Sequence, residues 1–127
     1  MTNCRTVVVK ELPESVTQSQ VPQLRREIAP LVGADWPCVI LDFSNVLELD
    51  RAGVEMLLRS MEEAVKRNGD VKLACVSPQV TVILELTQVD RLFEVFESLA
   101  DAMESFRRFP VEAFREKTGL TATGAND

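Results

Sequence analysis

The side chains best placed to do chemistry lie in residues 41–58, LDFSNVLELDRAGVEMLL, where a strand-like run passes into a helix-like run. Asp42 and Asp50 are carboxylates near this junction, and the hydroxyl of Ser44 lies between them in sequence. Two carboxylates without further ligands make a poor metal site, and a serine after a strand is usually a turn residue. The junction therefore supplies charge and shape, but no complete catalytic or metal-binding set.

The rest of the chain adds little catalytic chemistry. It contains no histidine, which removes the commonest general base and the usual activator of a serine or cysteine nucleophile. The cysteines Cys4, Cys38 and Cys75 lack the close spacing of zinc ligands. We expect buried thiols at Cys38 and Cys75, because both lie in apolar runs. A glycine-rich phosphate loop is also absent. We expect no enzymatic activity, no metal and no cofactor.

The formal net charge of −6 indicates which partners to expect. Nucleic acids and anionic membranes both bind cationic surfaces, so an acidic chain favours protein partners. The longest apolar runs are far too short to cross a bilayer, and the N-terminal residues lack the apolar core of a signal peptide. We therefore expect a cytoplasmic protein with no direct membrane insertion.

Strand and helix patterns alternate along the chain and define the expected frame of the junction. Strand-like runs cover residues 6–12, 38–43, 71–76 and 92–96. Apolar residues at helical spacing follow each run, and helix N-caps are expected at Asp50, Ser77 and Ser98. In the helix after the junction, the predicted inner face consists of Val54, Leu57, Leu58, Met61, Ala64 and Val65. Four strand–helix repeats predict an α/β fold with a largely parallel sheet.

Four stretches stand in a characteristic order: VILDFSNV, LELDRAGVEMLLRSMEEAVKRNG, VKLACVSPQVTVILELTQVDRLFEVFES and LADAMESF. Together they resemble the STAS domain, the family of bacterial anti-sigma factor antagonists, over about residues 6–106. The resemblance implies a STAS-like α/β fold with a four-stranded, largely parallel or mixed sheet and four main helices. It also implies a single domain over residues 1–127, with a C-terminal extension from about residue 107 and a tail, 118–127, that we expect to be disordered.

In this family the turn before the second long helix usually reads Asp-Ser-Ser-Gly or Asp-Ser-Thr-Gly, and the hydroxyl residue just before the glycine is phosphorylated. The unphosphorylated form binds an anti-sigma factor kinase, and the phosphorylated form does not. Here the turn reads Asp50-Arg51-Ala52-Gly53, so the position equivalent to the phosphoacceptor is Ala52, which cannot be phosphorylated. The resemblance implies a partner-binding surface made of Asp50, Arg51, Ala52, Gly53, Val54 and Leu57.

Several alternatives remain open at this stage. Asp50 is either a helix cap or a partner contact, Gly53 is either structural or a contact, and Ser44 could be a displaced phosphoacceptor. Family members usually carry one more strand before the run at 6–12, whereas only residues 1–5 precede it here. The open edge could be covered by a partner, by a second copy in a homodimer, or by the extension after Phe106.

The resulting functional expectation is a non-enzymatic regulatory module. It would bind a kinase-type anti-sigma factor, or a related regulator, and would not be switched by phosphorylation at the usual position. The alternative is a STAS scaffold subunit of a larger signalling assembly or of a lipid-transporter complex.

Overall fold

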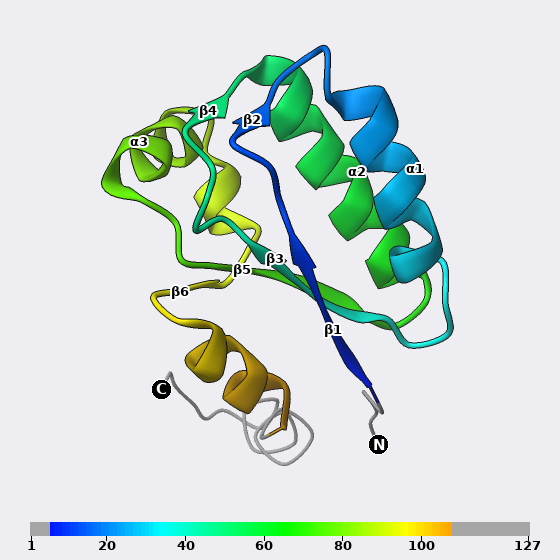
Figure 1. Cartoon of the computed structure of the whole chain (residues 1–127). Helices are drawn as coiled ribbons and strands as arrows, with labels where there is room; N and C mark the ends of the chain where they lie inside the picture. Colours follow the sequence, from blue (N-terminus) through cyan, green and yellow to red (C-terminus); the bar gives the residue numbers. More distant parts are fainter. Residues whose placement is uncertain (1–5, 108–127) are drawn as a thin grey trace.

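Four short parallel strands form the sheet at the centre of the protein (Figure 1). They are β1 (Val7–Glu11), β3 (Cys38–Asp42), β5 (Asp70–Ala74) and β6 (Val95–Phe96), in the spatial order β1-β3-β5-β6. The register places Val8 opposite Val39 and Leu41 opposite Leu73. The computed structural model describes residues 6–107, so the expected extension and tail lie outside the described residues.

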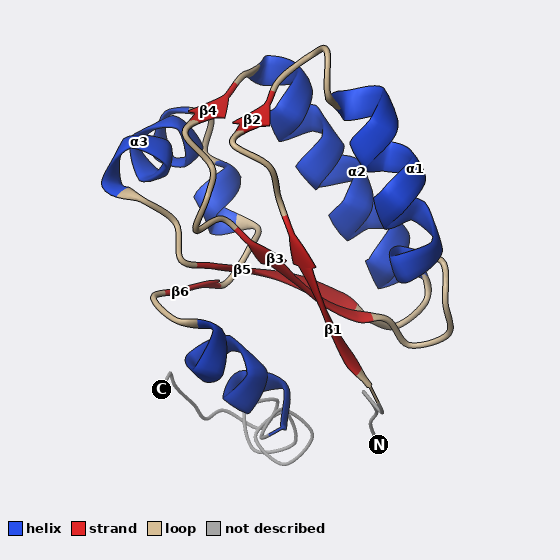
Figure 2. Cartoon of the chain, viewed as in Figure 1, coloured by secondary structure: helices blue, strands red, loops and turns tan. Residues whose placement is uncertain are grey.

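Helices cover both faces of this sheet, as Figure 2 shows. Helices α1 (Val21–Val32) and α2 (Arg51–Lys66) lie on one face, and a last helix, 99–107 as far as it is described, lies on the other. Helix α3 (Pro78–Leu86) and the 3-10 turn η1 (Val89–Arg91) lie near the carboxyl ends of the strands (Figure 1). Every residue of β3 is buried, as expected for a central strand between two helical layers. The predicted α/β architecture is confirmed.

N-cap residues recognised in the sequence predicted most helix starts correctly. The Ser77 hydroxyl accepts the Val80 N–H, and the Ser98 hydroxyl accepts the Asp101 N–H. The predicted strand at 92–96 is reduced to the two residues of β6. Gln88 adopts a left-handed backbone conformation (φ 63°), and the chain then turns through η1 before it reaches the sheet.

Cys38 is buried as predicted, at 1% exposed, but it is disulfide-bonded and so is not the free thiol that we expected. Cys75 is a free, partly buried thiol directly after β5. Burial raises the pKa of the Cys75 thiol, and the negative charge of Asp42 acts in the same direction. Since the thiolate is the nucleophilic form, this environment makes Cys75 less reactive than an exposed cysteine.

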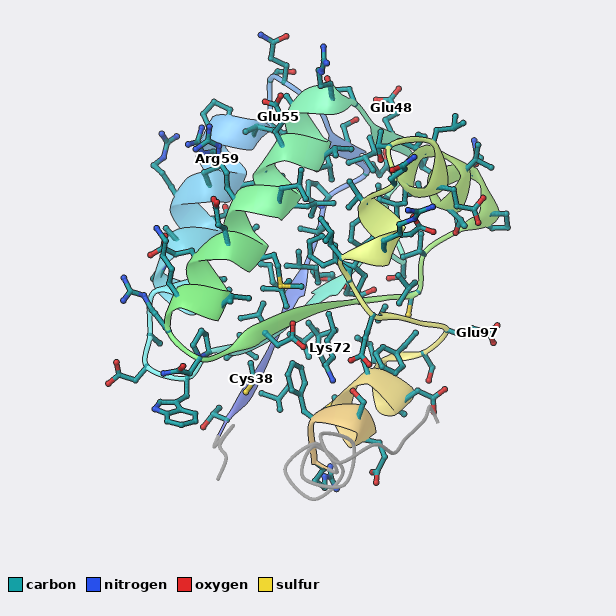
Figure 3. All side chains as sticks on the ribbon, turned by 180° about the vertical axis from the view of Figure 1, so that it is seen from behind. Cys38, Glu48, Glu55, Arg59, Lys72 and Glu97 are labelled. Atoms are coloured by element: carbon teal, nitrogen blue, oxygen red, sulfur yellow. The ribbon has the colours of Figure 1, made fainter. Side chains whose placement is uncertain are left out.

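A buried lysine holds the last helix against the sheet. Lys72 is only 3% exposed, and its Nζ donates to Ser105 Oγ at 2.7 Å and pairs with Glu94 Oε1 at 2.9 Å. The same Nζ lies 4.2 Å from the centroid of the Phe106 ring. Figure 3 shows Lys72 between β5 and this helix. Since a buried ammonium is costly unless it is paired, these contacts favour one docking position for the helix.

We expect Lys72→Ala to lower the free energy of unfolding by about 2–4 kcal/mol, because it leaves a cavity and removes the cation from the aromatic ring. Urea denaturation followed by circular dichroism would measure the change. Arg25→Ala is the control, since Arg25 is exposed on α1, and it should stay within about 0.5 kcal/mol of the wild type. Equal effects of the two substitutions would contradict the anchoring role.

Asp70, two residues before Lys72, is a second titratable group close to the sheet. Its Oδ1 accepts the Val71 N–H at 2.8 Å. Burial raises the pKa of the Asp70 carboxyl from 3.8 to about 6, although the nearby Lys72 ammonium acts in the opposite direction. Because the folded pKa lies above the unfolded value, protonation of Asp70 favours the folded state. This contribution is fully present below about pH 4 and is lost as the pH rises through about 6.

The wild type should therefore lose roughly 1–3 kcal/mol of stability, relative to Asp70→Asn, between about pH 4 and about pH 7. Asparagine keeps an oxygen that can accept the Val71 N–H but does not titrate. Denaturation curves of both proteins across this range would measure the difference. The exposed-residue control Asp35→Asn should follow the wild type, and a pH-independent difference between wild type and Asp70→Asn would refute the assignment.

Candidate functional site

A two-residue strand pair, absent from the sequence prediction, positions the start of α2. Strand β2 (Ser15–Val16) pairs in parallel with β4 (Glu48–Leu49) above the main sheet (Figure 1). The Ser15 hydroxyl donates to Glu48 Oε1 at 2.7 Å. The pair joins the segment that precedes α1 to the segment that precedes α2, so the two helices start from one shared support.

Asp50 is the N-cap of α2 and uses both of its carboxylate oxygens. Oδ1 accepts the Gly53 N–H at 3.0 Å, and Oδ2 accepts the Gln18 N–H at 3.0 Å. One side chain thus satisfies a free N–H of the first helical turn and also binds the loop before α1. Of the two readings of Asp50 left open by the sequence, the structure supports the helix cap.

Gly53 is required by close packing. A Cβ at this position would lie 2.2 Å from the Val16 carbonyl oxygen and 2.7 Å from Leu49 Cδ1. Both contacts are far below van der Waals distance, and one of them is to backbone. The first turn of α2 therefore rests directly on the β2–β4 pair, and only glycine allows this approach.

The six residues predicted to contact a partner separate into two groups. Gly53 is buried, and Val54 and Leu57 are 5% and 0% exposed, so these three lie inside this chain. The partner contact of the set stays a prediction, but these three side chains are not exposed to a partner. Asp50 and Ala52 are half-buried, and Arg51 is exposed. The amphipathic pattern of α2 had already indicated that Val54 and Leu57 face inward.

Sequence reasoning overlooked an apolar side chain at the same end of α2. Leu47 is 60% exposed, and the N–H groups of Leu47 and Glu48 both donate to the Glu14 carbonyl oxygen, at 2.8 and 3.0 Å. These bonds hold the segment before β4 in place. We call the surface residues Leu47, Arg51 and Ala52 the α2 tip. In the sequence, the available sign of this surface was an apolar residue three positions before the expected helix cap.

The remaining candidates from the junction have structural partners. Asp42 is 6% exposed, and its Oδ1 accepts the Ser44 N–H at 2.9 Å. Ser44 itself is exposed in the turn after β3. Residues 6–107 contain no group of three or more histidine, cysteine or acidic side chains placed to hold a metal ion. Within the same range, no helix has both the length and the apolar character needed to cross a bilayer.

The model of the STAS domain family matches residues 3–102. The chain belongs to the STAS domain family. An anti-sigma factor antagonist from Mycobacterium paratuberculosis is similar at 25% identity and a TM-score of 0.72, covering 84% of this chain and 90% of that one. No curated protein matches the sequence.

Two further solved structures share this fold. The phosphorylated form of the Bacillus cell fate determinant SpoIIAA has 22% identity and a TM-score of 0.64, covering 84% of this chain and 96% of its own. The STAS domain of a SulP transporter from Vibrio cholerae has 19% identity and a TM-score of 0.66, covering 88% of each chain. The family and fold implied by the sequence resemblance are confirmed.

We expect Asp50→Ala to lower the free energy of unfolding by about 1–2 kcal/mol, because it leaves the Gly53 and Gln18 N–H groups without their acceptor. Asp50→Asn should cost less, since its amide keeps one oxygen. Thermal and urea denaturation would measure both changes. Asp35→Ala, at an exposed aspartate, is the control and should be close to neutral. A neutral Asp50→Ala would contradict the bridging role.

Proposed function

We propose that this STAS protein is an anti-sigma factor antagonist-like regulator that acts by binding alone. Its partner would be a kinase-type anti-sigma factor, or a related regulator of bacterial transcription in the cytoplasm, bound through the α2 tip. The observation that carries the proposal is Ala52. It lies in the first turn of a capped helix, at the position where the family resemblance places the phosphoacceptor.

In this proposal, the side chain of residue 52 is the reason that phosphorylation cannot regulate partner binding. A phosphate on a side chain at residue 52 would lie at the N-terminus of α2, where free N–H groups and the helix dipole favour negative charge. It would also add nearly two negative charges to the partner-binding surface and repel or desolvate the partner. The methyl group of Ala52 cannot accept a phosphoryl group, so in this proposal the surface stays permanently open to its partner.

The surroundings of the α2 tip favour binding without rearrangement. The Asp50 carboxylate and the contact between Gly53 and Val16 fix the first turn of α2 before any partner arrives. Little conformational freedom then remains to be lost on association, which favours affinity. The exposed guanidinium of Arg51 adds a positive charge that can pair with a carboxylate of the partner.

The proposal predicts that Ala52→Asp weakens partner binding by more than about tenfold, because it places a charge in the interface. An aspartate in the first turn suits the helix dipole, but Ala52 is half-buried against the core, so circular dichroism would check that the variant is folded. Ala100→Asp, at an exposed position of the last helix on the opposite layer, is the matched control and should bind normally. Calorimetry with the purified anti-sigma factor kinase of the host would give both affinities.

The missing switch is tested on the same proteins. After incubation with the kinase and ATP, mass spectrometry should find no phosphate on the wild type, whereas Ala52→Ser should gain one at residue 52. Normal binding by Ala52→Asp would argue against the α2 tip as the binding surface. A phosphate on Ser44 of the wild type would contradict the absence of a switch.

One observation favours a second candidate, a STAS subunit of a larger signalling assembly or of a lipid-transporter complex. Among the described strands, β1 pairs only with β3, and Val9 on β1 is 39% exposed. An unpaired edge can accept a strand from a neighbouring subunit. Light scattering would distinguish the candidates, because a scaffold that assembles by itself would form particles much larger than a dimer.

A further inference from the structure

The outward face of α2 carries four exposed charged side chains in a regular order. Glu55, Arg59, Glu62 and Lys66 follow one another at intervals of four, three and four residues, and their charges alternate in sign. Residues three and four apart lie on one face of a helix, so these four form a continuous line. Glu55 and Arg59 are labelled on α2 in Figure 3. We call the four residues the charged stripe.

Most of these charges have no partner within the described part of the chain. No ion pair or side-chain hydrogen bond involves Glu55, Arg59 or Glu62 among residues 6–107. Lys66 pairs only with Glu63, at the long distance of 4.0 Å. The charged stripe is therefore available to another molecule.

The order of the charges makes the stripe complementary to itself. Read from either end, the spacing is the same and each charge is reversed. If two α2 helices lie antiparallel about a two-fold axis between Ser60 and Met61, Glu55 faces the second copy's Lys66 and Arg59 faces its Glu62. The two-fold axis repeats both pairs, as in any isologous contact.

An open groove runs along the charged stripe, and Glu55, Arg59 and Glu62 of the stripe line it together with Asp70 and apolar side chains. It has a volume of about 810 Å³, and its apolar lining consists of Leu58, Met61, Val65 and Leu92. Val65 and Leu92 are 58% and 59% exposed, so the sequence prediction that Val65 faces the core is wrong. The two-fold axis described above brings the groove side of one helix to the groove side of the other. Burying these side chains would add a favourable apolar contribution to the ion pairs.

We propose that this face of α2 binds a second copy of the chain, forming an antiparallel α2–α2 homodimer. Charge complementarity supports this occupant, because in the antiparallel arrangement a second copy of the stripe matches all four charges. The exposed apolar side chains lie where the two copies would meet. This proposal rests on the charged stripe and the groove and does not depend on the function proposed for the α2 tip.

Charge reversal on the stripe provides a specific test by sedimentation equilibrium over a range of concentrations. The wild type should dimerise, with a dissociation constant that rises with salt. Arg59→Glu with Lys66→Glu makes the stripe wholly negative, and Glu55→Lys with Glu62→Lys makes it wholly positive. Each double variant alone should raise the dissociation constant by more than about tenfold, since like charges then face each other.

Mixing the two double variants should restore a one-to-one dimer, because a negative stripe then faces a positive one. The matched control, Glu97→Lys with Glu104→Lys, makes the same charge change as the positive variant at exposed positions on and next to the last helix, and should dimerise like the wild type. Circular dichroism would show that all variants are folded. A wild type that stays monomeric at every concentration would refute the proposal, as would a dimer that survives both reversals.

Discussion

The two hydrogen bonds of the Asp50 carboxylate are the interaction on which the candidate site depends. They join the first turn of α2 to the loop before α1, two segments far apart in sequence. The β2–β4 pair below supplies the backbone surface against which Gly53 packs. Without this support, the Gly53 N–H would lose its acceptor and the first turn of α2 would have no fixed orientation. With it, the residues that could meet a partner are held by a rigid frame.

The two faces of the sheet are stabilised in different ways. On one face, α1 and α2 bury a continuous apolar core against the sheet, and the hydrophobic effect dominates. On the other face, which the last helix covers, a smaller apolar cluster including Ile40, Ala74 and Phe106 is completed by the buried ammonium of Lys72. Polar contacts of this kind specify position more than they add stability. Helix α2 is thus the element that fills the core on one side and carries the α2 tip and the charged stripe on its other side.

Much of the fold was predictable because its signals are local. Alternating strand and helix patterns gave the order of the main elements, and short polar side chains marked the caps at Asp50, Ser77 and Ser98. The β2–β4 pair was not predictable, because two segments of one polar and one apolar residue each are too short to carry a pattern and meet only in the folded chain. Val65 was misplaced for a similar reason: helical spacing defines a stripe, but the neighbouring elements decide how much of it is covered. The resemblance to the STAS family located the turn, whereas the structure was needed to separate its surface residues from its core residues.

The residues of the Asp50–Gly53 turn have separate structural roles, and this separation has an evolutionary consequence. The carboxylate at 50 and the missing side chain at 53 define the backbone, whereas the methyl group at 52 takes part in none of the hydrogen bonds that do so. Alanine and serine codons differ by a single base, so a hydroxyl can be gained or lost at this position without rebuilding the scaffold. Under the proposed function, regulated and unregulated versions of such a protein would be neighbours in sequence space, because one base change in codon 52 adds or removes the hydroxyl.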